Sequence, residues 1–247
     1  MSHYYEGRIR PRQAHVFGLI DVWSRLGAKI PALANFLTQA PGFSALAKVV
    51  VGIPKQRRIP PIAAESFTRT LAPQPQAAHK GDRPHVILWP DTFNNYYHPN
   101  TLAAAAEVLD AAGFFGPHAP AAPYAAGVPC MNSACSIWRL LRILEALRNG
   151  HYHHKSILKM SGEQRLLDKL GLDYEILDSG CCGMAGSFGF EKDKHAVSIA
   201  CAERVLLPAV RQAAEDTLII ADGFSCREQI AQCTERRAMH IAEITRL

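Results

Sequence analysis

The sequence lacks the features that mark secreted and membrane-spanning proteins. No stretch of about 18 uninterrupted apolar residues is present, so we expect no direct membrane span. The N-terminal segment also lacks the apolar core of a secretory signal. We therefore expect a cytoplasmic protein, either free or held at the inner membrane through partners.

The sequence also lacks a strong charge of either sign. Its net charge is +5, only 20% of its residues are charged, and those residues are scattered. The densest basic run, residues 55–58, is short and typical of a solvated loop, so we expect no nucleic-acid binding. No G-x-G-x-x-G motif opens a helix after a strand, which argues against a dinucleotide site.

The cysteines are too few and too irregular for a secreted disulfide framework. There are seven, an odd number, and two of them are adjacent. This usage favours a reducing compartment in which thiols serve metal or redox chemistry. With 247 residues and 48% hydrophobic content, the chain can bury a core in one large domain or two small ones.

The adjacent pair, Cys181 and Cys182, lies in a glycine-rich segment, residues 179–189, which we call the Gly-Cys loop. Thiolates bind soft metals, and glycine allows both a close backbone approach and positive φ angles. The residues alone leave three interpretations open. The loop forms the wall of a metal or iron–sulfur pocket, or it holds a buried thiol pair, or it contains a vicinal disulfide.

Four segments resemble the CCG (cysteine-rich) domain of iron–sulfur oxidoreductases. That domain occurs in heterodisulfide reductase and in the iron–sulfur subunits of glycolate and glycerol-3-phosphate dehydrogenases. It also forms a C-terminal module of FAD-linked D-lactate-type dehydrogenases, to which the resemblance is strongest. The resemblance is carried by residues 180–190, 151–155, 221–229 and 88–96, with a weaker likeness over 4–58.

The resemblance implies an α/β fold of CCG-type repeats, with short parallel strands and flanking helices after a helical N-terminal segment. It also implies an iron–sulfur cluster, of the 4Fe-4S type, held by cysteines from three loops that follow strands. Mapped onto this sequence, the ligand positions are Cys181, Cys182, Cys226 and Tyr152, and Gly183 lies beside the cluster. The implied role is electron transfer, as an iron–sulfur subunit or C-terminal fragment of a flavin-linked 2-hydroxy-acid dehydrogenase. The implied partners are a flavin-containing dehydrogenase and ferredoxin-like iron–sulfur subunits.

The sequence departs from this family in three ways. Tyr152 replaces a cysteine, and its phenol is a hard donor with a pKa near 10, so His153 or a neighbouring histidine is the substitute ligand. The first Cys-Cys-Gly motif is absent, and about a hundred residues are missing before His151, so we interpret the chain as a truncated, internally deleted relative. No FAD domain is present, so we expect no flavin site and no hydroxy-acid oxidation by this chain alone. The alternatives are zinc held by the three cysteines and a histidine, a cluster-free relic or interaction module, and a thiol-redox protein that uses Cys181 and Cys182.

Four segments organise the chain. We expect a helical segment over 1–58, a Pro-rich linker over 59–84, a degenerate first repeat over 85–150 and a CCG domain over 151–247. Helices are expected over the following ranges: 16–26, 32–37, 45–51 capped by Ser44, 102–112 capped by Asn100 or Thr101, 137–147, 161–170 with a capping box, 194–214 kinked or restarted at Pro208, and 226–233. Strands are expected over 85–89, 151–158, 172–177 and 217–221.

Several further side chains have two interpretations. Asp91, Asn94, Asn95 and His98 either line a site or cap a loop, and loop capping is favoured. Lys155 and Arg227 either offset thiolate charge or lie on the surface. We expect Cys201, which lies among apolar residues of a helix, to be buried in the core and Cys233 to be structural, while the pair Cys130 and Cys135 matches no strong metal motif.

Overall fold

The protein is described by a computed structural model that covers residues 7, 9–70, 86, 88–114, 145–149 and 160–247. The first part of this range is helical. Its helices are α1 (Arg12–Gly18), α2 (Ile20–Gly27), α3 (Pro31–Gln39), α4 (Phe43–Val51), α5 (Phe67–Thr70), α6 (Thr92–Tyr96) and α7 (Pro99–Ala111).

The second part alternates strands and helices. Its elements are β1 (Glu145–Asn149), α8 (Ser161–Lys169), β2 (Asp173–Ile176), the 3-10 helix η3 (Phe188–Phe190), α9 (His195–Glu203), α10 (Leu206–Gln212), β3 (Leu218–Ala221), α11 (Phe224–Cys233), β4 (Ala238–Met239) and α12 (Ile241–Arg246). The four strands form one parallel sheet in the order β2-β1-β3-β4. This confirms the expected fold class at the level of α/β.

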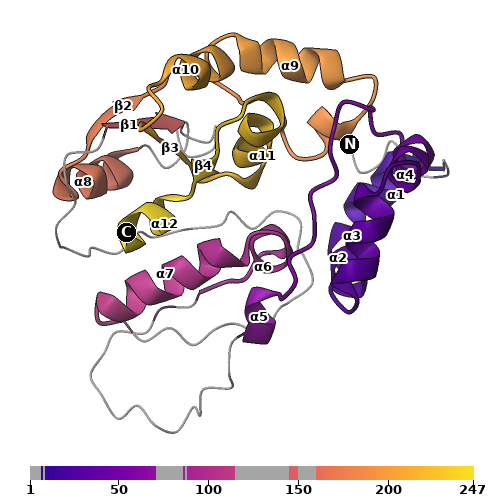
Figure 1. The fold of residues 1–247 in the computed structure, drawn as a ribbon, viewed down its shortest axis with the longest axis horizontal. Coiled ribbons are helices and arrows are strands. Elements are labelled where there is room, and N and C mark those ends of the chain that lie inside the picture. Colours follow the sequence, from indigo (N-terminus) through magenta and orange to yellow (C-terminus); the bar gives the residue numbers. More distant parts are fainter. Residues whose placement is uncertain (1–6, 8, 71–85, 87, 115–144, 150–159) are drawn as a thin grey trace, which may run out of the picture.

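The sheet is covered on both faces, as the alternation along β3 shows. Ile219 and Ala221 face one buried cluster that contains side chains of α10 and α11, whereas Ile220 faces a second cluster built from α8 and α12. Parallel strands buried on both faces consist of nearly continuous apolar residues, as Leu218–Ala221 does. In Figure 1, α9 and α10 lie along the top and α8 lies at the left, beside β2.

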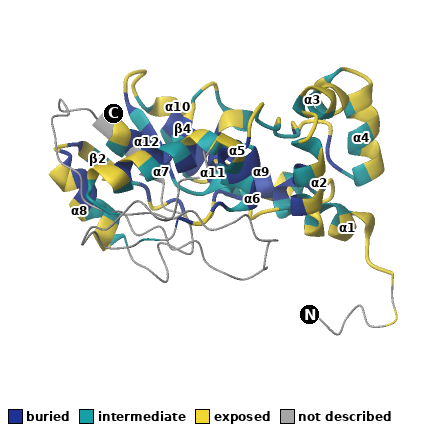
Figure 2. Ribbon diagram, turned by 90° about the horizontal axis from the view of Figure 1, so that it is seen from below, coloured by how far each residue is buried: buried dark blue, intermediate teal, exposed yellow. Residues whose placement is uncertain are grey.

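The N-terminal helices α1–α4 form a group at the right of Figure 1. Pro31 occupies the first turn of α3, as expected. The expected helix over 16–26 is instead two helices separated at Leu19, and Gly42, at a φ of 85°, precedes α4 in place of the predicted cap Ser44. Many large apolar side chains of α2–α4 are exposed, and Figure 2 shows α3 and α4 largely in the colours of exposed and intermediate residues.

The segment α5–α7 packs against the C-terminal part of the chain. α7 lies along α12, and the Thr101 hydroxyl donates a 2.7 Å hydrogen bond to the Glu243 carboxylate. The predicted caps of α7 were therefore wrong, because Thr101 bonds to α12 and His98 occupies the cap position. The expected strand over 85–89 contributes only an isolated bridge at Leu88 among its described residues.

Three other local predictions are corrected or refined by the structure. The helix expected over 137–147 fails at its end, because residues 145–147 belong to β1, where pairing with two neighbouring strands overrides a local helical pattern. The capping box at Ser161 is not formed, since Met160 is the cap residue and Ser161 is the first residue of α8. The long helix over 194–214 is broken into α9 and α10, with Pro208 in the first turn of α10. The remaining residues of 137–144 and the strand expected over 151–158 lie outside the described ranges.

None of the helices within the described ranges is both long and apolar enough to cross a membrane.

Leu167 tests how far the sheet depends on α8. Its side chain is fully buried in the cluster formed with Ile220 and Ile244. Leu167→Ala should lower the free energy of unfolding by about 2–5 kcal/mol, because it leaves a cavity where the cluster cannot fully collapse. Urea denaturation measures this loss. Val197→Ala, at an exposed position of α9, is the control and should change stability by less than about 0.5 kcal/mol. Equal effects of both substitutions would contradict the assignment of Leu167 to the core.

Candidate metal centre

The Gly-Cys loop and the start of α11 lie at the same edge of the sheet. The loop follows β2, α11 follows β3, and both strands pair with β1. Because the strands are parallel, their carboxyl ends meet at one edge, where open α/β sheets place their ligands. A hydrogen bond of 3.3 Å from the Gly186 N–H to the Ser225 hydroxyl joins the two segments directly.

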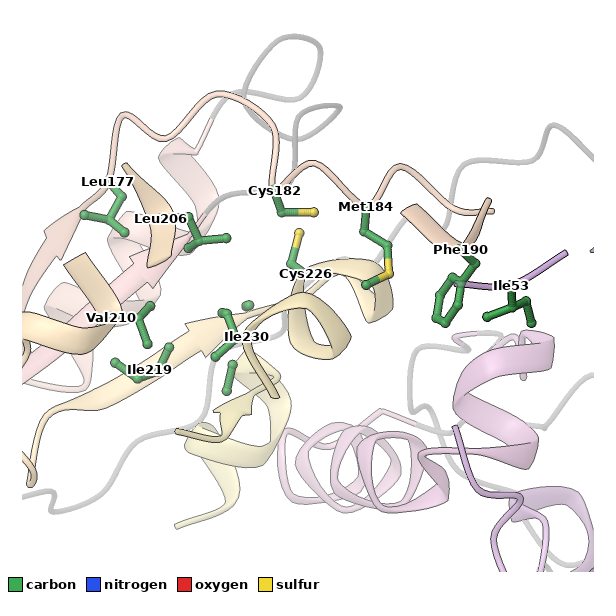
Figure 3. Close-up of a cluster of buried hydrophobic side chains, with 12 residues drawn as sticks. Ile53, Leu177, Cys182, Met184, Phe190, Leu206, Val210, Ile219, Cys226 and Ile230 are labelled. Atoms are coloured by element: carbon green, nitrogen blue, oxygen red, sulfur yellow. The ribbon is translucent and has the colours of Figure 1, made fainter. Parts of the chain in front are cut away.

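Three cysteine side chains meet at this edge. Cys182 and Cys226 are buried, with exposed fractions of 5% and 2%, whereas Cys181 is exposed. Figure 3 shows the sulfur atoms of Cys182 and Cys226 pointing toward each other across the two segments. Hydrogen bonds link Cys181 to Cys182 and Cys182 to Cys226, so the three thiols form a chain.

The thiol chain holds its protons tightly. Donation to Cys182, followed by burial, raises the pKa of Cys181 well above its ordinary value. For Cys182, the hydrogen bond from Cys181 lowers the pKa, but donation to Cys226, burial and the charge of Cys226 outweigh it and raise the pKa to about 12. A thiolate at this position therefore requires a cation to stabilise it, and a soft metal ion is such a cation.

Backbone geometry explains the glycines of the loop. Gly183 has a φ of 82°, and a Cβ atom there would lie 2.0 Å from the carbonyl oxygen of Ser198 on α9. The loop therefore packs directly on the backbone of α9 and needs a residue without a side chain. Gly180 also has a positive φ, of 61°, but the space around it is open. Gly183, rather than Gly180, thus fixes the distance between the loop and α9.

The donor set fits a thiolate-bound metal or cluster only in part. Cys181, Cys182 and Cys226 supply three soft donors, and the expected fourth donors Tyr152 and His153, like Lys155, lie outside the described residues. Within the described ranges, no group of three or more His, Cys, Asp and Glu side chains is already arranged to hold a metal ion. The five described cysteines are all free thiols, so Cys181 and Cys182 do not form a vicinal disulfide.

Arg227 was expected either to influence the thiols or to lie on the surface, and the surface position is wrong. The side chain is buried, and its guanidinium donates to the carbonyl oxygens of Ala221 at 3.2 Å and Asp222 at 2.7 Å. It also donates to the Asn94 side-chain oxygen at 2.9 Å. Burial lowers the pKa of Arg227, which the neighbouring charges of Glu243 and Asp222 partly oppose. Arg227 therefore ties the end of β3 to the segment before α7.

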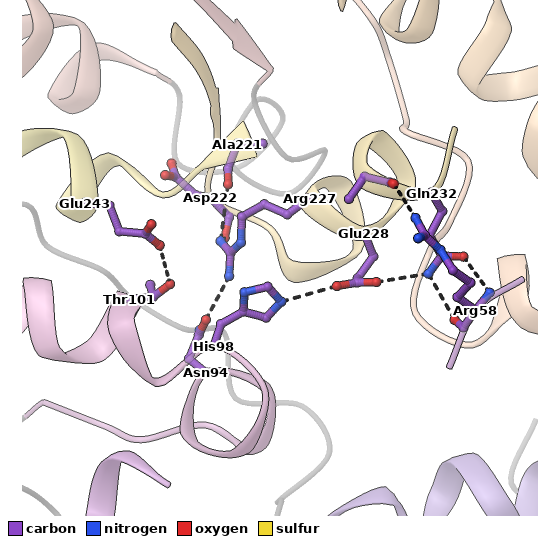
Figure 4. A network of polar contacts seen from close by, with 11 residues as sticks. Arg58, Asn94, His98, Thr101, Ala221, Asp222, Arg227, Glu228, Gln232 and Glu243 are labelled. Atoms are coloured by element: carbon purple, nitrogen blue, oxygen red, sulfur yellow. Dashed lines mark hydrogen bonds and ion pairs between the residues drawn. The ribbon is translucent and has the colours of Figure 1, made fainter. Parts of the chain in front are cut away.

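The polar residues after Leu88 are structural, in line with the favoured interpretation. Asp91 caps α6 by accepting hydrogen bonds from the N–H groups of Phe93 and Asn94. His98 lies 3.3 Å from the Glu228 carboxylate (Figure 4). The Asn95 side chain accepts from the Thr68 N–H at 3.0 Å. These groups join segments of the chain and do not converge on the three cysteines.

Cys201 and Cys233 are only partly buried, which corrects the expectation of a core position for Cys201.

Nothing in the sequence pattern singles out Arg57, although it is buried and donates to the carbonyl oxygen of Gly189 in the Gly-Cys loop. Its position within a short basic run favoured a solvated loop.

Substitution of Gly183 tests the contact between the loop and α9. Gly183→Ala should strongly destabilise the protein, because the new Cβ atom would collide with the backbone of α9. Gly180→Ala is the matched control and should cost only about 1–2 kcal/mol, the strain of a positive φ without a collision. Thermal unfolding of both variants measures the difference. Equal losses would show that backbone strain alone accounts for both glycines.

The thiol chain predicts a dependence of stability on pH in the metal-free protein. Folded Cys182 keeps its proton up to about pH 12, whereas in the unfolded chain it titrates near its ordinary pKa of 9.0. Above that pH the folded state binds more protons, so stability should fall by up to about 1.4 kcal/mol per pH unit from Cys182 alone. Urea denaturation between pH 8 and 10.5 measures the slope. Cys182→Ala should flatten it and Cys201→Ala should not, and an unchanged slope in Cys182→Ala would contradict the raised pKa.

Comparison with known proteins finds similarity over part of the chain. The anaerobic glycerol-3-phosphate dehydrogenase of Escherichia coli contains a polypeptide, its C subunit, that is 38% identical over 72 residues, which are 28% of this chain and 17% of that relative. D-2-hydroxyglutarate dehydrogenase of Pseudomonas putida is 31% identical over 81 residues, 33% of this chain and 8% of that enzyme. The chain thus matches less than a fifth of the length of either relative.

No family model matches the chain. No solved structure matches it either. What the comparisons support is a relation to dehydrogenases, and hence to oxidoreductases, over about a third of the chain.

Proposed function

We propose that this chain is an iron–sulfur electron-transfer component, a subunit or a C-terminal fragment, of a flavin-linked 2-hydroxy-acid dehydrogenase of the D-lactate or glycolate type. The observation that carries the proposal is the meeting of Cys181, Cys182 and Cys226 at the carboxyl edge of a parallel sheet. Three linked thiols, two of them buried, are a donor set suited to iron–sulfur chemistry. The similarity to two dehydrogenases supports the same class.

The ligands would come from the ends of three strands. Cys181 and Cys182 follow β2, and Cys226 follows β3. β1 lies between these strands and ends at Asn149, where it pairs with Ala221. His153 comes four residues later in the sequence, a distance of at most about 14 Å along the chain, so the fourth ligand is expected from this segment.

A bound cluster would supply one-electron transfer, and the chain's own residues would hold and shield it. Burial of Cys182 and Cys226 keeps water from two of the three sulfur ligands. The Gly183 N–H donates to the Cys181 sulfur at 3.4 Å, a contact that would stabilise negative charge on that sulfur. Gly183 therefore acts both through its close packing on α9 and through its N–H group.

The proposed partners are a flavin-containing dehydrogenase and ferredoxin-like iron–sulfur subunits, which would place the protein in the cytoplasm or, through them, at the inner membrane. The exposed apolar side chains of α2–α4 support docking to another protein surface, because monomeric proteins rarely leave so many large apolar groups in water. They include Val22, Trp23, Leu26, Leu33, Phe36, Leu37, Phe43, Leu46, Val49 and Val50. The same surface favours the second candidate function, an interaction module of this family that binds no cluster.

Iron and sulfide analysis tests the proposal. After anaerobic reconstitution, the wild-type chain should contain about four irons and four sulfides, with a visible charge-transfer spectrum and an EPR signal on reduction. Cys181→Ser, Cys182→Ser and Cys226→Ser should each lose the cluster, because each removes a ligand. Cys201→Ser and Cys233→Ser are the matched controls and should retain it.

The same analysis separates the alternatives. His153→Ala should lower the iron content if the imidazole is the fourth ligand, whereas Tyr152→Phe should not. One zinc per chain, held without sulfide, would support the zinc alternative. A colourless wild-type protein that unfolds cooperatively and binds no metal would support the interaction module. Unchanged iron content in Cys182→Ser would contradict the assignment of Cys182 as a cluster ligand.

A further inference from the structure

Arg57 reaches the back of the Gly-Cys loop from the N-terminal part of the chain. It lies in the segment after α4, and only 1% of its surface is exposed. Its Nε donates to the carbonyl oxygen of Gly189 at 2.9 Å, and its Nη2 donates to the hydroxyl of Ser198 at 3.0 Å. Its Nη1 lies 4.0 Å from the sulfur of Cys233. The guanidinium is thus fixed by two hydrogen bonds between the loop and α9.

The positive charge of Arg57 has no carboxylate partner among the described residues. No Asp or Glu oxygen in that part of the chain lies within 4.0 Å of its guanidinium, although buried charges are normally paired. Glu228, the carboxylate whose charge acts on Arg57, is already engaged by His98 at 3.3 Å and Gln232 at 3.0 Å (Figure 4).

The groups that act on Arg57 point to the sulfur site. Burial lowers the pKa of Arg57, and the charges of Cys233, Cys182 and Glu228 oppose that shift. Two of these three groups are thiols, and Cys182 belongs to the three-cysteine site. Arg57 bonds to Gly189 at the end of the loop that carries Cys181 and Cys182. A buried cation without a carboxylate partner is costly, and the cost falls when negative charge is brought near it.

We propose that Arg57 is a positioning residue of the metal centre: its hydrogen bonds to Gly189 and Ser198 fix the guanidinium behind the Gly-Cys loop, and its positive charge there offsets the negative charge of the thiolate ligands. The inference rests on the proposed function, since it requires a thiolate-bound centre at Cys181, Cys182 and Cys226. It adds that the site depends on the N-terminal segment, which is more than a hundred residues away in the sequence. If Arg57 only held the backbone segments together, loss of its hydrogen bonds would weaken metal binding and loss of its charge would not.

Measurements of metal binding by the 247-residue chain separate the effect of the Arg57 charge from the effect of its packing. The probes are Co²⁺, followed by its thiolate charge-transfer absorption, and iron with sulfide, followed by iron content and by the reduction potential of the reconstituted centre. Arg57→Gln should weaken Co²⁺ binding roughly 10- to 100-fold, as is typical when a group that supports metal ligands is removed. It should also make the reduction potential more negative, because reduction adds an electron where a positive charge has been lost.

Two variants serve as matched controls. Arg57→Lys keeps the charge and loses the forked hydrogen-bonding geometry, and it should bind Co²⁺ within about threefold of wild type. Arg58→Gln removes an equal charge at the adjacent exposed position, where the guanidinium donates to the carbonyl oxygen of Ala231, and should leave binding and potential unchanged. Far-UV and near-UV circular dichroism establish that each variant is folded.

The outcomes distinguish this inference from the proposed function. If wild type binds neither Co²⁺ nor iron, the proposed function fails and the role of Arg57 fails with it. If wild type binds and Arg57→Gln binds equally well at the same potential, the role of Arg57 alone is overturned. If Arg57→Gln does not fold, Arg57→Lys and Ser198→Ala decide the question, because both retain the charge and alter a hydrogen bond. Near wild-type affinity in both supports the charge, and a tenfold loss in either folded variant means that packing, not charge, is responsible.

Discussion

The pairing of β1 with both β2 and β3 is the constraint on which the rest of the structure depends. It places the two cysteine-bearing segments on either side of one strand, with Ile176 and Ala221 near the same end of the sheet. Neither segment is close to the other in the sequence, since α9, α10 and β3 intervene. Without β1 as the shared neighbour, the thiol chain from Cys181 to Cys226 would have no reason to form. The chemistry of the site therefore follows from strand order, and the glycines then set how closely the loop approaches.

The same edge of the sheet also organises the N-terminal part of the chain. Phe17 lies 6.2 Å from Phe190 between ring centroids, and Ile53 is buried in the same cluster as Cys182. Arg57 completes this contact through Gly189. These interactions attach α1–α4 to the Gly-Cys loop from behind, while many apolar side chains of α2–α4 stay exposed. Helices α1–α4 therefore contact the Gly-Cys loop on one side and expose apolar side chains on another. A partner protein bound to those exposed side chains would lie close to the three cysteines.

The sequence predicted correctly those features of the structure that depend on residues close together in the chain. The Gly-Cys loop, the strands within 172–177 and 217–221, and Pro31 at the start of α3 were all predicted, because glycine, proline and apolar runs constrain the backbone near themselves. The predictions failed where a distant partner decides. Residues 145–147 form a strand because two other strands pair with them, and Thr101 bonds to Glu243 instead of capping its own helix. The burial of Arg57 and Arg227 could not be predicted for the same reason, since burial of an arginine depends on what packs over it.

The two buried arginines illustrate different solutions to the cost of an interior charge. Arg227 donates to two backbone carbonyls at the end of β3 and to Asn94, and carboxylates such as Glu243 and Asp222 act on it. Its two terminal nitrogens are thus bonded to the polypeptide, whereas its Nε has no hydrogen-bond partner in the described part of the chain. Arg57 bonds to one carbonyl and one hydroxyl, and two of the three groups whose charge acts on it are thiols. Within the described part of the chain no carboxylate oxygen lies within 4.0 Å of the Arg57 guanidinium, so negative charge of the kind that the proposed metal centre would supply lowers the cost of its burial.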